Sequence, residues 1–169
     1  MNPRSVVLDA LPPRSIGAEI GVHLGEFSED ILLVVRPRKL HLIDPWKHET
    51  SAEYSKAWYG GTVKKGQAGM DARYEVVVHR AASETTLGGM ADDSLDWVYI
   101  DGNHYYEFVK TDLELSMRKV RPGGLITGDD YQEGGFWEGG VVKAVDELVG
   151  SGVVEVIAIQ DFQYILKRL

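Results

Sequence analysis

Residues 17–28 read Gly-Ala-Glu-Ile-Gly-Val-His-Leu-Gly-Glu-Phe-Ser, a short apolar run that leads into a turn with two glycines. The apolar run is typical of a buried β-strand. The segment that follows, residues 26–35, predicts a helix because its apolar side chains recur at helical spacing: Phe27, Ile31, Leu32 and Val35. A strand, a glycine turn and a helix in this order indicate the start of an α/β unit.

The same alternation continues along the sequence. Strands are predicted at 40–43, 74–79, 95–100, 125–127, 153–159 and 162–166, and helices at 105–119 and 141–149. Strands that alternate with helices indicate a mostly parallel sheet covered on both faces. Almost no residues separate the last two strands, so they must form a hairpin in which one strand runs antiparallel. We expect one domain over residues 1–169, without internal repeats.

Composition narrows the function. The 169 residues carry a formal net charge of −8 and show no basic stripe, so we expect no nucleic-acid partner. The absence of cysteine excludes disulfides, zinc–thiolate sites and a thiol nucleophile, and it fits a cytoplasmic location. The apolar runs are too short to cross a membrane. The expected partners are small molecules or other proteins.

Two segments resist assignment to strands or helices. Residues 46–73 and 131–140 combine aromatic side chains with glycine, and the second contains Tyr131, Phe136 and Trp137. Long loops of this kind often close over a ligand. The alternative for 46–73 is a partly helical surface insertion with some buried rings. Because aromatic side chains in exposed loops can pack against a second copy of the chain, a homodimer is one expected state.

In an open parallel sheet, ligands bind beyond the carboxyl ends of the strands. Gly21 and Gly25 let the first loop turn tightly and approach a ligand, and the helix after them offers free N–H groups. Asp44 ends the second strand, where a carboxylate can accept hydrogen bonds from ribose hydroxyls. These features alone also suit an NAD site or a plain strand–helix turn.

Acidic side chains follow two further strands. Asp101 ends the fourth strand, and Asp129 and Asp130 end the fifth. If these strands are parallel neighbours, three carboxylates converge and repel one another unless a proton or a cation compensates. Oxygen ligands favour Mg²⁺, with Ca²⁺ or Mn²⁺ as alternatives. Taken separately, each acid could also stand in an ordinary exposed turn.

His104 stands three residues after Asp101, near the start of the next predicted helix. Histidine titrates near neutral pH, so it could take a proton from a hydroxyl group beside the metal. The alternative is a helix-capping or surface histidine.

The first loop resembles the E/D-x-G-x-x-x-G loop of class I S-adenosylmethionine-dependent methyltransferases. Its spacer, Val22-His-Leu24, replaces the close glycines that a dinucleotide pyrophosphate requires. The segments LHLIDPW, LDWVYIDG and RPGGLI follow in the order of the same family. The resemblance implies a Rossmann-like fold whose seven-stranded sheet has the order 3-2-1-4-5-7-6. It also implies cofactor contacts from Glu19, Gly21, Gly25, Asp44 and Asp101, with Ser83 and Glu84 near the adenine.

A second resemblance concerns D-G-N-H-x-Y-E-x-V-x-x-D-L-E, residues 101–114, and the later D-D-Y, residues 129–131. Both motifs are similar to those of metal-dependent O-methyltransferases, a family that includes macrolide-sugar O-methyltransferases. This resemblance implies metal ligands at Asp101, Asp129 and Asp130, and a catalytic base at His104. We predict His104 and Asp101 to be the catalytic residues.

The sequence departs from that family in three respects. Asn103 stands where an acid is frequent, and Asp129 where the sugar enzymes can carry glutamate. The large N-terminal extension with which those enzymes assemble and enclose substrate is also missing, so we expect the substrate class not to transfer.

The sequence therefore predicts an S-adenosylmethionine-dependent O-methyltransferase that acts, with Mg²⁺, on a hydroxyl group of a small molecule such as a sugar or a diol. A metal-independent methyltransferase, a non-catalytic S-adenosylmethionine-binding module and an NAD-dependent oxidoreductase are the alternatives. The acceptor, the metal and the oligomeric state stay open.

Overall fold

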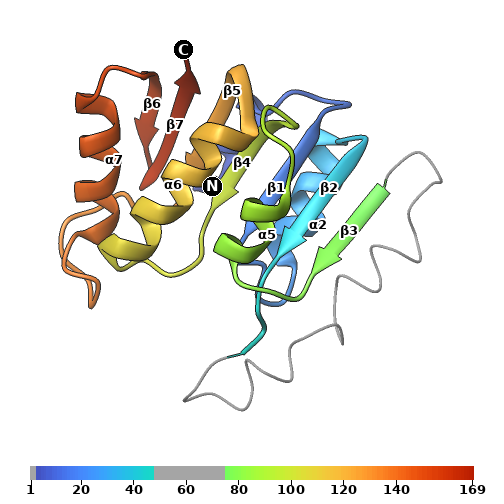
Figure 1. Ribbon diagram of the computed structural model, residues 1–169, viewed down its shortest axis with the longest axis horizontal. Coiled ribbons are helices and arrows are strands. Elements are labelled where there is room, and N and C mark those ends of the chain that lie inside the picture. Colours follow the sequence, from blue (N-terminus) through green and yellow to red (C-terminus); the bar gives the residue numbers. More distant parts are fainter. Residues whose placement is uncertain (1–2, 48–74) are drawn as a thin grey trace.

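The computed structural model describes residues 3–47 and 75–169. At its centre lies a seven-stranded sheet of order β3-β2-β1-β4-β5-β7-β6 (Figure 1). Neighbouring strands from β3 to β5 pair in parallel, whereas β7 runs antiparallel to both β5 and β6. The predicted strand order and the antiparallel strand in the final hairpin are confirmed.

The strands are β1 (Ile16–Ile20), β2 (Lys39–Ile43), β3 (Glu75–His79), β4 (Leu95–Ile100), β5 (Val120–Gly128), β6 (Val154–Gln160) and β7 (Gln163–Arg168). The helices are α1 (Ser5–Ala10), α2 (Glu26–Asp30), α5 (Ser83–Gly89), α6 (Tyr106–Lys119) and α7 (Gly140–Gly150), and a π-helical turn, η1 (Ile31–Val35), continues α2. Helices α1 and α5 were not predicted, because six or seven residues are too few to show a helical period. No helix in the described part of the chain is long and apolar enough to cross a membrane.

The sheet is covered on both faces. Helices α5, α6 and α7 lie on one face, and α1, α2 and η1 lie on the other (Figure 1). Successive side chains of β4 alternate between the two cores, so Val98 packs towards α6 while Trp97 and Tyr99 pack towards α2. Gly17 of β1 lies beneath Trp97, where an added Cβ would be 2.1 Å from the indole ring.

The carboxyl ends of the central strands meet at one edge. The backbone N–H of Gly21 donates to Ile43 at 3.0 Å, and that of Asp101 donates to Ile20 at 2.8 Å. The N–H of Asp129 donates to Ile100 at 3.1 Å. These bonds join the first residue after each strand to the neighbouring strand, so the loops predicted to carry the chemistry begin side by side.

Candidate active site

The two glycines of the first loop adopt conformations that favour glycine. Gly21 has φ +86°, and a Cβ there would lie 2.0 Å from the backbone oxygen of Asp101. Gly25 has φ +82° and precedes the first turn of α2. Left-handed backbone strains any residue with a side chain. The loop can therefore pass this close to β4 only because position 21 has no side chain.

Asp44 fixes the same loop from the end of β2. Its Oδ2 accepts the backbone N–H of Val22 at 3.0 Å and of His23 at 2.9 Å, and its Oδ1 accepts that of Trp46 at 2.6 Å. The carboxyl group is buried yet lines the pocket described below. Asp44 thus supports the loop and lines the pocket, and its contact with a ribose stays a prediction.

Trp46 belongs to the segment that was predicted to be either a lid or an insertion with buried rings. Its side chain is buried in the core, and its indole N–H donates to the backbone oxygen of His23 at 2.7 Å. Trp46 therefore fits the buried-ring alternative. Residues 48–73 of that segment lie outside the described residues.

Glu19 lies beneath the loop and is only 1% exposed. Its Oε2 accepts the hydroxyl of Ser28, on α2, at 2.5 Å. Burial raises the pKa of this carboxyl group to about 8, although the Ser28 hydrogen bond opposes the shift. Glu19 is not among the residues that line the pocket, so its observed contacts support the loop. Its predicted cofactor contact stays a prediction.

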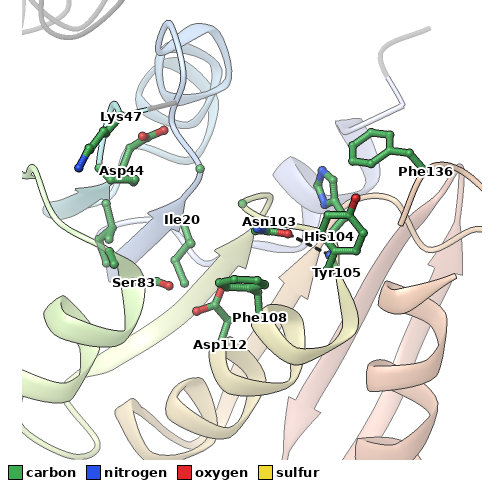
Figure 2. A pocket seen from close by; sticks show the side chains of 15 residues that line it. Ile20, Asp44, Lys47, Ser83, Asn103, His104, Tyr105, Phe108, Asp112 and Phe136 are labelled. Carbon is green, nitrogen blue, oxygen red and sulfur yellow. Dashed lines mark hydrogen bonds between the residues drawn. The ribbon is translucent and has the colours of Figure 1, made fainter. Parts of the chain in front are cut away.

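A pocket of about 490 Å³ opens at the carboxyl edge of the sheet (Figure 2). Apolar walls come from β1, β2 and α6, and polar groups come from the loops that follow the strands. Among its lining residues are Ile20, Gly21, Ile43, Asp44, Ser83, Gly102, Asn103, His104, Phe108 and Asp112. The volume of the pocket and its mostly apolar lining with a few polar groups are typical of a site that binds a small molecule.

Helix α5 contributes one of its two predicted residues to this pocket. Ser83 lines the wall, whereas Glu84 is exposed and is not a lining residue. Ser83 donates a hydrogen bond to Asp112 of α6, a buried acid that the sequence analysis missed. Burial raises the pKa of Asp112 to about 6. An acid between the inward-facing Val109 and Leu113 of a predicted helix was the signal that could have found it.

The acidic side chains gather at the ends of β4 and β5, as predicted, but a positively charged side chain of the protein lies among them. Arg4, just before α1, places its Nη2 2.5 Å from Asp101 Oδ2 and 2.7 Å from Asp129 Oδ2. The other oxygen of Asp129 accepts the side-chain amide of Gln163 at 2.5 Å. Burial raises the pKa of Asp101 to about 7, a shift that Arg4 opposes and that the neighbouring acids, Asp129 and Asp130, reinforce.

His104 joins the other side of the cluster. Its Nε2 lies 3.1 Å from Asp130 Oδ2 and 3.9 Å from Asp101 Oδ1. Among the described residues, ligand atoms of Asp101, His104 and Asp130 lie within 4.8 Å of one another, a set that could hold a metal ion. Asp129, the third predicted ligand, turns towards Arg4 and Gln163 instead. The metal ligands and the base stay predictions.

The loop before α7 builds the mouth of the pocket. Phe136 is 72% exposed, lines the pocket and lies 6.0 Å from the ring of Tyr105 (Figure 2). Trp137 packs 5.2 Å from the ring of His104. Tyr131 points elsewhere and donates to Asp146 at 2.7 Å. Two of the three predicted aromatic side chains therefore stand beside the site.

Comparisons with known proteins agree with this arrangement. Residues 18–131 match a family model described as a methyltransferase domain. A protein of Acanthamoeba polyphaga mimivirus is 39% identical over 59 residues, which is 35% of this chain and 26% of that protein. A protein of Sinorhizobium fredii (strain NBRC 101917 / NGR234) is 26% identical over 137 residues, which is 77% of this chain and 15% of that protein. The chain thus spans 15% to 26% of the length of these relatives.

Two solved structures extend the comparison to the whole fold. A Corynebacterium glutamicum protein superposes with a TM-score of 0.72, at 14% identity, over 99% of this chain and 81% of that chain. A candidate caffeoyl-CoA O-methyltransferase from Staphylococcus aureus gives a TM-score of 0.65, at 14% identity, over 99% of this chain and 80% of that chain. Identity this low shows the fold alone. The chain therefore belongs to the methyltransferase domain family and has the fold of the class I S-adenosylmethionine-dependent methyltransferases.

Proposed function

We propose that this chain is an S-adenosylmethionine-dependent O-methyltransferase that acts on a hydroxyl group of a small molecule such as a sugar or a diol. The observation that carries the proposal is the pair formed by His104, which lines the pocket, and Asp130, 3.1 Å from it, with Gly21 of the first loop lining the same pocket. A base held by an acid beside a cofactor-sized pocket suits the removal of a hydroxyl proton.

The pocket fits the proposed cofactor. Gly21 lines the pocket while its loop packs against the end of β4, and the bonds from the loop's N–H groups hold the Asp44 carboxylate at the pocket wall, where it could accept hydrogen bonds from ribose hydroxyls. Ser83 and Asp112 offer polar groups on the opposite wall, between the apolar surfaces of Ile43 and Phe108. When bound, S-adenosylmethionine supplies an electrophilic methyl group on a positively charged sulfur.

The chain's own residues supply the acid–base chemistry. Asp130 accepts a hydrogen bond from Nε2 of His104 when that nitrogen is protonated, so it stabilises the imidazolium formed after proton removal. Trp137 packs on the His104 ring and restricts its orientation. Phe136 and Tyr105 exclude water from the mouth of the pocket. Much of the acceleration would come from holding the acceptor at a near-attack distance.

The acidic cluster also fits a divalent cation. Asp101 and Asp130 offer carboxylate oxygens, the donor type that Mg²⁺ prefers, and His104 or Asp129 could complete the set. Such a cation would lower the pKa of an acceptor hydroxyl. One observation favours the metal-independent alternative, because Arg4 already neutralises part of the charge on Asp101 and Asp129.

The first test is calorimetric titration with S-adenosylmethionine and, separately, with NAD. We expect micromolar binding of S-adenosylmethionine and none of NAD. Absence of binding to S-adenosylmethionine would remove the basis of the proposal, and binding of NAD alone would favour the oxidoreductase.

The second test measures transfer of a labelled methyl group to a panel of sugars and diols, with Mg²⁺ and with a chelator. We expect His104→Gln and Asp130→Asn to lower kcat by roughly 10²- to 10⁴-fold, while S-adenosylmethionine still binds. Glu107→Gln, an exposed site in the first turn of α6, is the matched control and should be unaffected. Full activity of both variants would refute the base, and activity unchanged by the chelator would refute the metal.

A further inference from the structure

Arg4 is held in the acidic cluster from several sides. Its Nε and Nη2 both donate to Asp129 Oδ2, at 3.0 and 2.7 Å, while Nη2 also reaches Asp101 Oδ2. The guanidinium carbon lies 4.9 Å from the ring centroid of Phe27 and 5.7 Å from that of Tyr99. A planar guanidinium suits this combination of forked hydrogen bonds and ring stacking, which an ammonium group cannot reproduce.

With Arg4 in this position, both carboxylate oxygens of Asp129 are already occupied by hydrogen-bond donors of the chain. Its Oδ2 accepts from Arg4, and its Oδ1 accepts from Gln163 and from the backbone N–H of Asp130. The remaining set that could hold a metal, among the described residues, contains His104 as its third member. An imidazole nitrogen that binds a metal cannot at the same time accept a proton. In this arrangement the metal and the catalytic base would compete for one side chain.

We propose that Arg4 is an internal competitor of the divalent cation. It offsets part of the negative charge on Asp101 and Asp129 when the metal is absent, and it must withdraw before all three aspartates can bind one ion and leave His104 free as the base. The inference rests on the metal-binding part of the proposed function. It makes Arg4 the residue that sets the affinity of the site and decides which side chain completes the metal's ligand set.

The sign of the effect follows from charge. A fixed positive group that shares two carboxylates with an incoming divalent cation repels that cation and occupies its ligands. Removing the guanidinium, as in Arg4→Met, should therefore tighten cation binding. Replacing it with an ammonium group, as in Arg4→Lys, keeps the charge but loses the paired hydrogen bonds, so the affinity should be intermediate. Coupled binding of this kind usually changes affinity by about 5- to 150-fold.

The experiment titrates the full chain with Mn²⁺ alone and counts free Mn²⁺ by electron paramagnetic resonance. We expect Arg4→Met to bind Mn²⁺ roughly 10- to 100-fold more tightly than the unchanged protein, with Arg4→Lys in between. Arg118→Met is the matched control. It removes the same charge from an exposed position at the far end of α6 and should leave the affinity unchanged.

A double-mutant cycle identifies the ligand that Arg4 withholds. Asp129→Asn should cost little Mn²⁺ affinity in the unchanged background and should abolish the gain in the Arg4→Met background. Equal costs in both backgrounds would overturn the competition. Thermal unfolding of metal-free Arg4→Met, repeated with Mn²⁺, serves as the folding check, and Arg4→Lys provides the same comparison if Arg4→Met does not fold.

The remaining outcomes separate this inference from the proposed function. Measurable and equal Mn²⁺ affinity in the Arg4→Met and unchanged proteins would overturn the role of Arg4 and leave the metal site standing. No Mn²⁺ binding by either protein would overturn both the role of Arg4 and metal assistance. Binding of S-adenosylmethionine and transfer of its methyl group are measured independently of Mn²⁺ binding, so neither result depends on the role of Arg4.

Discussion

Replacing Glu19 with glutamine tests whether the buried acid beneath the first loop keeps its proton in the folded protein. The pKa of this carboxyl group rises from its ordinary value of 4.5 to about 8, chiefly through burial. Because burial disfavours the carboxylate, the folded protein holds this proton to a higher pH than the unfolded chain does. Between pH 4.5 and about 8, the folded state therefore binds one more proton, and its free energy of unfolding falls as the pH rises.

The size of the effect follows from the shift. At about 1.4 kcal/mol per pH unit, a carboxyl group displaced this far costs on the order of 5 kcal/mol of stability once the pH exceeds 8. Glu19→Gln keeps an acceptor for the Ser28 hydroxyl and cannot ionise. We expect the variant and the unchanged protein to be similarly stable near pH 5, and the variant to be more stable by a few kcal/mol near pH 9.

The assay is urea denaturation of both proteins at several pH values between 5 and 9. Taking the difference between the two curves removes the contributions of titrating groups that do not interact with Glu19, such as Asp112, because both proteins share them. Glu26→Gln, an exposed site in the first turn of α2, is the control and should show no pH-dependent difference. Parallel curves for Glu19→Gln and the unchanged protein would refute the reasoning.

Two further predictions concern the loop and the mouth of the pocket. Gly21→Ala should lower both the free energy of unfolding, by about 1–3 kcal/mol, and the affinity for S-adenosylmethionine, because the new Cβ would meet Asp101 while the backbone is left-handed. Scanning and titration calorimetry measure the two losses. The control, Gly88→Ala, should show neither loss, because a Cβ at position 88 meets nothing within 4 Å. Phe136→Ala should change stability by less than about 0.5 kcal/mol, because the ring is 72% exposed, but should raise the acceptor KM in steady-state kinetics. An unchanged KM would show that the ring does not contact the acceptor.

The sequence predicted the fold well because the evidence for it is local. Each strand from β1 to β7 carries a short apolar run, and α6 and α7 show helical spacing that a single pass along the chain can detect. The final hairpin follows from its length alone, since the residues between β6 and β7 are too few for any other connection. The two short helices escaped detection because each is held by packing on the sheet more than by its own sequence.

The candidate site could be predicted where its residues follow a strand by one or two positions, as Gly21, Asp44, Asp101 and Asp130 do. It was missed where contacts join distant parts of the chain. Nothing in the segment around Arg4 indicates that its side chain reaches acids 97 and 125 positions later. Such a contact depends on where α1 docks, and sequence periodicity does not encode that position.

The environment of Asp129 has a consequence for how the chain matures during synthesis. This acid receives one partner from 125 positions earlier and another, Gln163, from 34 positions later, on the strand that completes the sheet. A ribosome-bound chain that has folded β1 to β5 therefore has the pocket walls but lacks one of the donors that orient this carboxylate. The acidic cluster should reach its final arrangement only after β7 has inserted between β5 and β6, so most of the pocket wall should form before the acidic cluster is complete.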